Sequence, residues 1–167
     1  ASASTQPLPR DLPVLSLCPW TADFLREHGA VVGDEDVLNA TVSAVLGYAM
    51  VRLQDDRLDE ALGDEDTALL LGTTLYAHHV ARLTAVAGPA IGPLLVQAWQ
   101  DYAEAMLVER QPDAWTEARW RQSLGRYAPL WLAPAALLLA HGKPEVVPDL
   151  QRLAVALAEA HQLGNDA

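Results

Sequence analysis

The sequence has few of the residues that support disulfides or basic surfaces. Its 167 residues include one cysteine, and 11 Lys and Arg stand against 22 Asp and Glu, which gives a formal net charge of −11. A single cysteine excludes an internal disulfide, so we expect Cys18 to be a buried, inert thiol in a reducing, cytoplasmic setting. The acidic balance argues against a nucleic acid or an anionic membrane surface as a partner.

The sequence also lacks a long uninterrupted hydrophobic run. The longest apolar run, 127–140, contains Pro129 and Pro134 and is too short to cross a bilayer. Residues 1–19 carry four prolines and no basic start followed by an apolar stretch, so they do not resemble a secretory signal. We therefore expect no integral membrane segment.

Alanine and leucine dominate the composition, and 51% of the residues are hydrophobic. Apolar residues recur at helical spacing, without strand-like alternation or a fixed-period repeat. The sequence contains no phosphate-binding glycine loop, nucleophile elbow or zinc-ligand spacing. These patterns predict an all-α fold, with a Pro-rich N-terminal arm over residues 1–19 and a single helical domain over residues 20–167.

Capping residues and helix breakers predict where the helices begin and end. Thr21 and Asp113 are the expected N-caps of the first and fifth helices, and Pro129 and Pro134 should kink or break the apolar segment 130–140. The last helix is expected to start near Pro148. The expected helices cover residues 22–28, 34–62, 64–88, 91–111, 114–124, 130–140 and 148–166.

Four carboxylates lie within six residues near the end of the second expected helix, at Asp55, Asp56, Asp59 and Glu60. On a helix several of them share one face, where like charges repel unless water or a cation compensates. Two interpretations stay open from these residues alone. One is a solvated helix end with local arginine partners, and the other is a site for Mg²⁺, which prefers oxygen ligands.

Other polar and aromatic groups have similar alternatives. Arg119, Arg121 and Arg126 form a basic cluster that either neutralises the surface or binds an anion. Trp99 and Tyr102 share a stripe of the fourth helix, and such stripes are usually core. The adjacent residues 78 and 79 are histidines that cannot share a helix face, so we expect surface or core histidines there rather than metal ligands.

Three segments carry a resemblance to a known family. Residues 55–60 match the aspartate-rich DDxxD(E) motif, and residues 160–166 resemble the start of a second metal motif, in which Gln is followed by Asn-Asp or Asp-Asp. Residues 126–130 lie where prenyl synthases carry Lys-Thr ahead of an apolar helix. Over residues 34–166 the chain therefore resembles the class I isoprenoid synthase superfamily, which includes trans-prenyl diphosphate, squalene and phytoene synthases and terpene cyclases.

The resemblance implies a helical bundle in which two acidic helix ends face each other and Mg²⁺ ions bridge them to a substrate diphosphate. It implies a Mg²⁺-dependent terpenoid or prenyl synthase-like enzyme that ionises an isoprenoid diphosphate, and homodimers are common in the family. The implied metal ligands are Asp55, Asp56, Asp59, Glu60, Asn165 and Asp166, of which the first three are the implied catalytic residues. The implied substrate-binding residues are Arg126, Gln162, Tyr48, Trp99 and Tyr102, whose aromatic members would stabilise a carbocation.

Departures from the family pattern favour a second reading. The basic Gly-Gly-Lys-x-x-Arg-Pro segment typical of prenyl synthases is absent, as is the Arg-Arg pair that commonly follows their first motif. The second motif stops at Ala167, before its remaining acidic residues. Either the sequence is incomplete at its C-terminus, or the second metal site is incomplete. These departures favour a catalytically inactive helical protein of the same fold that binds an isoprenoid or a partner. A third reading, an unrelated bundle with a solvated acidic patch, predicts no cavity beneath the acids.

Overall fold

The structure is a computed structural model that describes the backbone of residues 14–58, 65–112 and 114–165, and the side chains of residues 16–55, 67–112 and 114–163. All regular structure in these ranges is helical, which confirms the predicted all-α fold. The α-helices are α1 Val14–Glu27, α2 Asp34–Leu58, α3 Glu65–Ala87, α4 Gly92–Glu109, α5 Glu117–Ser123, α6 Leu132–Ala140 and α7 Val147–Asn165. Three 3-10 helices join them, η1 Gly88–Ile91, η2 Leu124–Trp131 and η3 Pro144–Val146.

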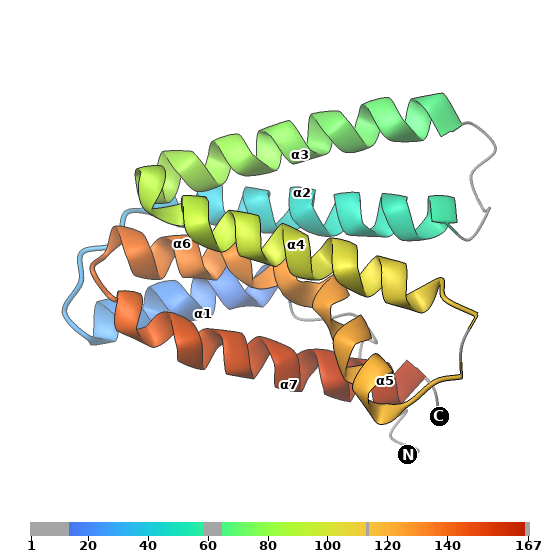
Figure 1. The fold of residues 1–167 in the computed structure, drawn as a ribbon. Coiled ribbons are helices and arrows are strands. Elements are labelled where there is room, and N and C mark those ends of the chain that lie inside the picture. The colour runs from blue at the N-terminus through green and yellow to red at the C-terminus, as the bar shows by residue number, and fades with distance from the viewer. Residues whose placement is uncertain (1–13, 59–64, 113, 166–167) are drawn as a thin grey trace, which may run out of the picture.

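Helix α6 forms the centre of the bundle. Its residues from Leu132 to Leu138 are all buried, and it packs against α1, α2 and α3 (Figure 1). Because its side chains are apolar all round, α6 is stable only when neighbours cover every face. Pro134 lies in its first turn, where a backbone N–H would have no intrahelical partner. The segment expected to be kinked or broken divides where η2, which contains Pro129, ends and α6 begins, whereas α6 continues through Pro134 without a break.

Helices α2 and α3 pack closely through small residues. Ala40 and Ala44 are buried, and a Cβ on Gly47 would lie 3.0 Å from Cε1 of His79. The Nδ1 of His79 lies 2.9 Å from both the hydroxyl and the backbone carbonyl oxygen of Ser43, and the Ser43 hydroxyl donates to the His79 carbonyl at 3.1 Å. Burial lowers the pKa of His79, so the ring stays neutral. His79 is therefore a core histidine, as expected.

The first helix begins earlier than predicted. It starts at Val14 and contains Pro19, and Thr21 is not its N-cap because the Thr21 hydroxyl donates to the Leu17 carbonyl at 2.8 Å. Tertiary burial explains the longer helix, since its buried face consists of Leu17, Cys18, Ala22 and Leu25. Burial raises the pKa of the Cys18 thiol to about 12, which confirms the expected buried thiol.

The fifth helix also begins at a different cap. Thr116 is the N-cap of α5, and its hydroxyl accepts a hydrogen bond from the Arg119 amide at 3.2 Å. The expected cap, Asp113, lies outside the described residues, as does the expected end of the second helix at residue 62. The third helix agrees with the prediction, because it ends at Ala87 and the chain reverses at Gly88, where φ is +58°.

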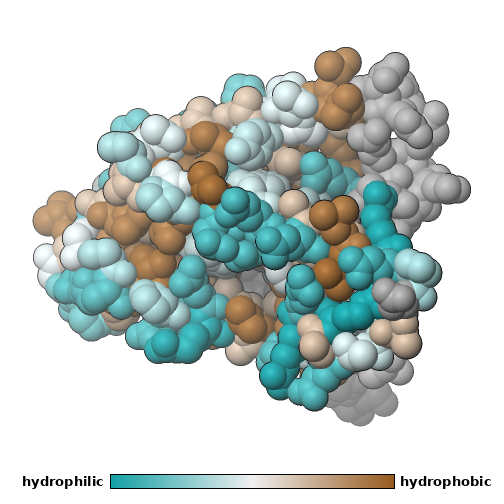
Figure 2. Space-filling model, viewed as in Figure 1, coloured by the Kyte–Doolittle hydropathy of each residue, from teal (hydrophilic) through white to brown (hydrophobic). Residues whose placement is uncertain are grey.

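One stretch of the described chain, Thr67–Glu109, is long and apolar enough to cross a membrane by length and composition alone. In the structure it is folded back on itself, because α3 and α4 run antiparallel on either side of η1 (Figure 1). Leu69, Leu70 and Leu71 at the start of α3 are exposed, and hydrophobic side chains are visible on this face of the molecule (Figure 2). The expectation of no integral membrane segment stays a prediction.

The contact between η2 and α4 depends on a glycine, and we predict that Gly125→Ala is destabilising. A Cβ at residue 125 would lie 2.6 Å from the Asp101 carbonyl oxygen, so η2 would have to move away from α4. We expect the free energy of unfolding, measured in urea, to fall by about 1–3 kcal/mol. Gly92→Ala is the matched control, because nothing lies within 4 Å of a Cβ there. Equal stability of the two variants would show that η2 and α4 are not tightly packed at residue 125.

The buried His79 predicts a pH dependence of stability. Its pKa is lowered in the folded protein, so below about pH 6.5 the unfolded chain binds a proton that the folded chain does not. The free energy of unfolding should therefore fall as the pH drops below that value. We expect His79→Gln to reduce this slope and His78→Gln, at the exposed neighbouring position, to leave it unchanged. Identical slopes for both variants would contradict the assignment.

Candidate functional site

A polar cavity of about 180 Å³ lies at the end of the bundle where α2, α4 and α7 all have their C-terminal halves (Figure 1). Among the residues that the structure describes, helix α2 contributes four to the lining, η2 three, α7 two and α4 one. The lining residues are Tyr48, Val51, Arg52, Asp55, Met106, Arg126, Tyr127, Leu130, His161 and Gln162. We term this space the polar cavity.

The polar cavity brings together described parts of all three motif segments. Asp55 comes from the first acidic motif, Gln162 from the second, and Arg126 from the segment between them. Tyr48, an expected substrate-binding residue, lies on the same wall. The side chains of the other expected ligands lie outside the described residues, namely Asp56, Asp59, Glu60, Asn165 and Asp166. Within the described side chains, no group of three or more His, Cys, Asp or Glu residues could hold a metal ion.

Arg126 connects three elements around this cavity. Its guanidinium donates to Glu109 Oε1 at 2.8 Å, to the Tyr127 hydroxyl at 3.1 Å and to Gln162 Oε1. The side chains of Arg126 and Glu109 are only 20% and 21% exposed, so solvent screens this ion pair weakly. The guanidinium also lies 5.0 Å from the centre of the Tyr127 ring. Arg126 thereby links α4 and α7 to η2.

The electrostatic environment of the polar cavity favours positive charge. Burial alone would lower the pKa of Arg126, but Tyr127, Glu109 and Asp55 outweigh it and raise that pKa. The pKa of the nearby Tyr102 is raised as well, first by burial and then by the charges of Asp55 and Glu109. The C-terminal ends of α2, α4 and α7 add the negative ends of three helix dipoles. Arg126 and Arg52 supply the positive charge that this environment favours.

Sequence reasoning missed Glu109, Tyr127 and His161 as residues of this site. Glu109 closes the last turn of α4, where the helix dipole disfavours a carboxylate, and this was a signal that a cation lies nearby. The Tyr127 hydroxyl lies 3.3 Å from Gln162 Oε1, and its ring packs edge-on against His161 at 5.9 Å. No local pattern predicted these contacts, because they join elements far apart in the sequence.

Trp99 and Tyr102 do not line the polar cavity, although we expected both to bind substrate. Trp99 instead packs edge-on against Tyr76 and Tyr102, each at 5.3 Å between ring centres, and against His79 at 5.9 Å. Tyr102 is only 5% exposed. These rings pack between α3 and α4, so the aromatic side chains at the cavity are Tyr48 and Tyr127 rather than this stripe.

The three arginines expected to form a basic cluster have separate roles. Arg119 donates to the Val108 carbonyl at 2.7 Å and to the Gln111 carbonyl at 3.0 Å, which satisfies the C-terminal end of α4. Arg121 pairs with Glu117 at 2.7 Å on the surface. Of the three, only Arg126 lines the polar cavity, where a second arginine, Arg52, lies 3.2 Å from Asp55.

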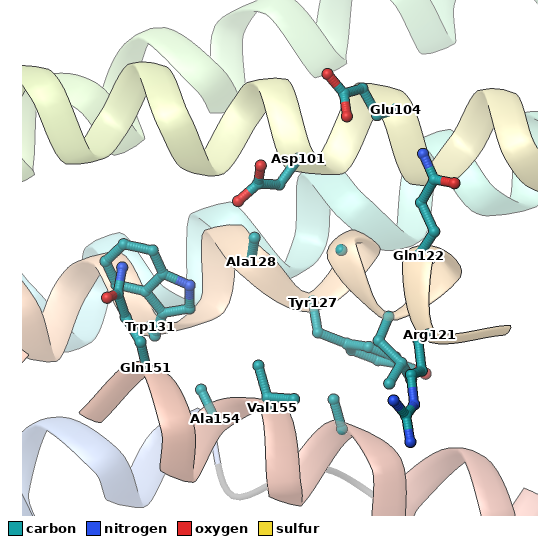
Figure 3. Close-up of a pocket in the computed structure, with 13 residues that line it drawn as sticks. Asp101, Glu104, Arg121, Gln122, Tyr127, Ala128, Trp131, Gln151, Ala154 and Val155 are labelled. Carbon is teal, nitrogen blue, oxygen red and sulfur yellow. The ribbon is translucent and has the colours of Figure 1, made fainter. Parts of the chain in front are cut away.

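A larger groove of about 410 Å³ lies between α4, η2 and α7 (Figure 3). We term it the apolar groove, because small and apolar side chains form most of its walls. Polar side chains, including Asp101 and Glu104 of α4, stand along one side. Its lining residues are Asp101, Glu104, Arg121, Gln122, Leu124, Gly125, Tyr127, Ala128, Trp131, Gln151, Ala154, Val155 and Ala158.

The Arg126–Glu109 pair predicts a stability effect. Glu109→Gln keeps the shape of the side chain but leaves the partly buried guanidinium without its counter-charge. We expect the free energy of unfolding to fall by about 1–3 kcal/mol. Asp23→Asn removes a carboxylate from an exposed i,i+3 pair with Arg26 and should cost no more than about 0.5 kcal/mol. Urea unfolding measures the free energy of unfolding of both variants. An equal loss in both would mean that the Arg126–Glu109 pair contributes no more to stability than a surface ion pair.

Comparison with known proteins identifies no family for this chain. No protein-family model, curated protein or solved structure matches the chain. Function must therefore be inferred from the polar cavity and the apolar groove themselves.

Proposed function

We propose that the protein is a Mg²⁺-dependent helical enzyme of the class I isoprenoid synthase type that ionises an isoprenoid diphosphate. One observation carries the proposal. Asp55, Arg126 and Gln162, which come from three separate motif segments, line the same small polar cavity. An unrelated bundle with a solvated acidic patch would not need these three segments to meet, and it predicts no cavity beneath the acids.

Two of the oxygen donors at the cavity are of the kind that Mg²⁺ combines with water and substrate phosphates, namely the Asp55 carboxylate and the Gln162 amide oxygen. In the structure they contact Arg52 and Arg126, so a metal would have to replace these contacts and take its further ligands from the rest of the two motifs. The remaining ligands of this proposal are Asp56, Asp59 and Glu60 from the first motif. Asn165 and Asp166 would complete the set from the second motif. The negative C-terminal ends of α2 and α7 support a cation at this place.

The reaction requires heterolysis of one carbon–oxygen bond. Both electrons leave with the diphosphate oxygen, and an allylic carbocation remains on the hydrocarbon. When bound, Mg²⁺ acts as a Lewis acid that stabilises the negative charge on the leaving diphosphate. Arg126, held in place by Glu109 and Gln162, would donate hydrogen bonds to that anion. Tyr48 on the cavity wall would place an aromatic face near the cation.

The direct test is diphosphate release from allylic isoprenoid diphosphates by the full chain. We expect release that requires Mg²⁺ and stops when the metal is chelated. Asp55→Asn should lower the rate roughly tenfold or more, because even residues that only support metal ligands cost 10–100-fold when mutated. Asp149→Asn, at the start of α7 far from the cavity, should leave the rate unchanged.

Two outcomes would count against catalysis. If Asp55→Asn and the control release diphosphate equally fast, the polar cavity is not the site of ionisation. If no chain length is ionised but an isoprenoid diphosphate still binds, the second reading holds, namely a catalytically inactive isoprenoid-binding protein of the same fold. The missing Gly-Gly-Lys-x-x-Arg-Pro segment is the observation that favours this second reading.

A further inference from the structure

Helices α4 and α7 flank the apolar groove and leave it open between them. Both helices pack against η2, which forms the floor of the groove, whereas no substantial packing of α4 against α7 is found in the described residues. Figure 3 shows the two helices on opposite sides of the groove, with η2 between them. Two helices that share a floor without packing on each other leave a trough of the shape that a further helix fills.

The α7 wall of the groove presents an apolar stripe that is partly open to solvent. Ala154, Val155 and Ala158 line the groove together with Gln151, and the four follow the i, i+3, i+4, i+7 spacing of one helix face. Val155 is 51% exposed although it faces the groove (Figure 3). Ala128 of η2 adds a second small apolar side chain at the floor. A partner that covered this stripe would remove apolar surface from water.

Two carboxylates on the α4 wall lack a cationic partner. Asp101 and Glu104 are i,i+3 neighbours, and neither forms an ion pair with any side chain that the structure describes. Asp101 accepts a hydrogen bond from the Gln97 side-chain amide at 2.7 Å. The arginine of the described lining, Arg121, is already paired with Glu117 at 2.7 Å. One side of the groove therefore carries uncompensated negative charge, in a chain whose formal net charge is −11.

The helical walls limit the conformation that a partner can have. The backbone N–H and C=O groups in the middle of α4 and α7 bond within each helix, so these walls offer no edge to which an extended peptide could add hydrogen bonds. A partner that buries apolar side chains here must satisfy its own backbone groups, as a helix does. Amphipathic helices bind grooves of this kind through residues spaced i, i+3, i+4 and i+7.

A second copy of this chain does not match the charge of the groove. Two copies repel each other, because each has a formal net charge of −11. The described helix richest in arginine is α5, and both of its arginines already have partners. Arg119 donates to carbonyl groups at the C-terminal end of α4, and Arg121 pairs with Glu117. A basic partner is therefore a different protein.

From these observations we infer that the apolar groove is the docking site for an amphipathic, basic helix of a partner protein. The apolar stripe of that helix lies over η2 and contacts Ala128 and Val155. Its Lys or Arg side chains flank the stripe on the side of Asp101 and Glu104. Neither metal nor diphosphate takes part in this contact, so the inference does not depend on the proposed function.

The test uses two dye-labelled helical peptides of about 18 residues, or five turns. Both have the same leucine stripe at i, i+3, i+4, i+7 spacing, and one flank of the stripe carries lysines in the first peptide and glutamates in the second. Fluorescence anisotropy gives their dissociation constants with the full chain at physiological salt, without Mg²⁺ or diphosphate. We expect the lysine peptide to bind at least about tenfold more tightly than the glutamate peptide.

A pair of exposed α7 positions shows whether the peptide binds in the groove. Val155→Gln places a polar side chain in the apolar stripe and should raise the dissociation constant of the lysine peptide at least about fivefold. Leu153→Gln is the matched control, because Leu153 is 50% exposed and does not line the groove. It should leave the constant unchanged.

A second pair of variants tests the charges. Asp101→Asn combined with Glu104→Gln should reduce the preference for lysine over glutamate to less than about threefold. Asp23→Asn combined with Glu27→Gln removes the same charge from exposed positions of α1 and should leave the preference as it was.

Four results would overturn the inference. The first is failure of the lysine peptide to bind at concentrations up to about 1 mM. The second is equal affinity for the lysine and glutamate peptides, and the third is an unchanged dissociation constant in Val155→Gln. The fourth is self-association of the unaltered chain that Val155→Gln abolishes, because the groove would then hold a second copy.

Discussion

The partly buried ion pair between Arg126 and Glu109 is the interaction on which the functional end of the bundle depends. Arg126 is held at once by Glu109 of α4, Tyr127 of η2 and Gln162 of α7. These contacts fix the relative positions of three elements around the polar cavity. They also place a guanidinium among carboxylates and helix C-termini, where positive charge is needed. In the proposed function, the same group that stabilises this end of the fold would also contact the diphosphate.

The rest of the fold holds η2 where this pair can form. The segment continues directly into α6, whose complete burial anchors it at the centre of the bundle. On its other side, Gly125 lets η2 approach the backbone of α4 closely enough for Arg126 to reach Glu109. Tyr127 lines both the apolar groove and the polar cavity.

Much of this fold follows from local sequence signals. The acidic start of α2, the reversal at Gly88 and the broken apolar segment before α6 were all predictable from charge, glycine and proline positions. The start of α1 was not, because burial of Cys18 and its neighbours outweighs the helix-breaking tendency of Pro19. For the site, the family resemblance implied that the segments carrying Asp55, Arg126 and Gln162 meet, and these three side chains line one cavity. A periodic stripe shows that Trp99 shares a helix face with other apolar residues, but it does not show which elements or cavity that face contacts. The pairing of Glu109 with Arg126 was not predictable either, because it joins residues of two different elements.

The central claim is that the two motif-bearing helix ends share one metal–diphosphate site opposite Arg126. Crystals grown with Mn²⁺ in place of Mg²⁺ and with inorganic diphosphate would test it by anomalous scattering. We predict manganese peaks between the C-terminal ends of α2 and α7, within coordination distance of Asp55, and diphosphate oxygens in hydrogen-bonding reach of Arg126. Diphosphate bound without manganese at these helix ends, or manganese bound only elsewhere, would contradict the claim.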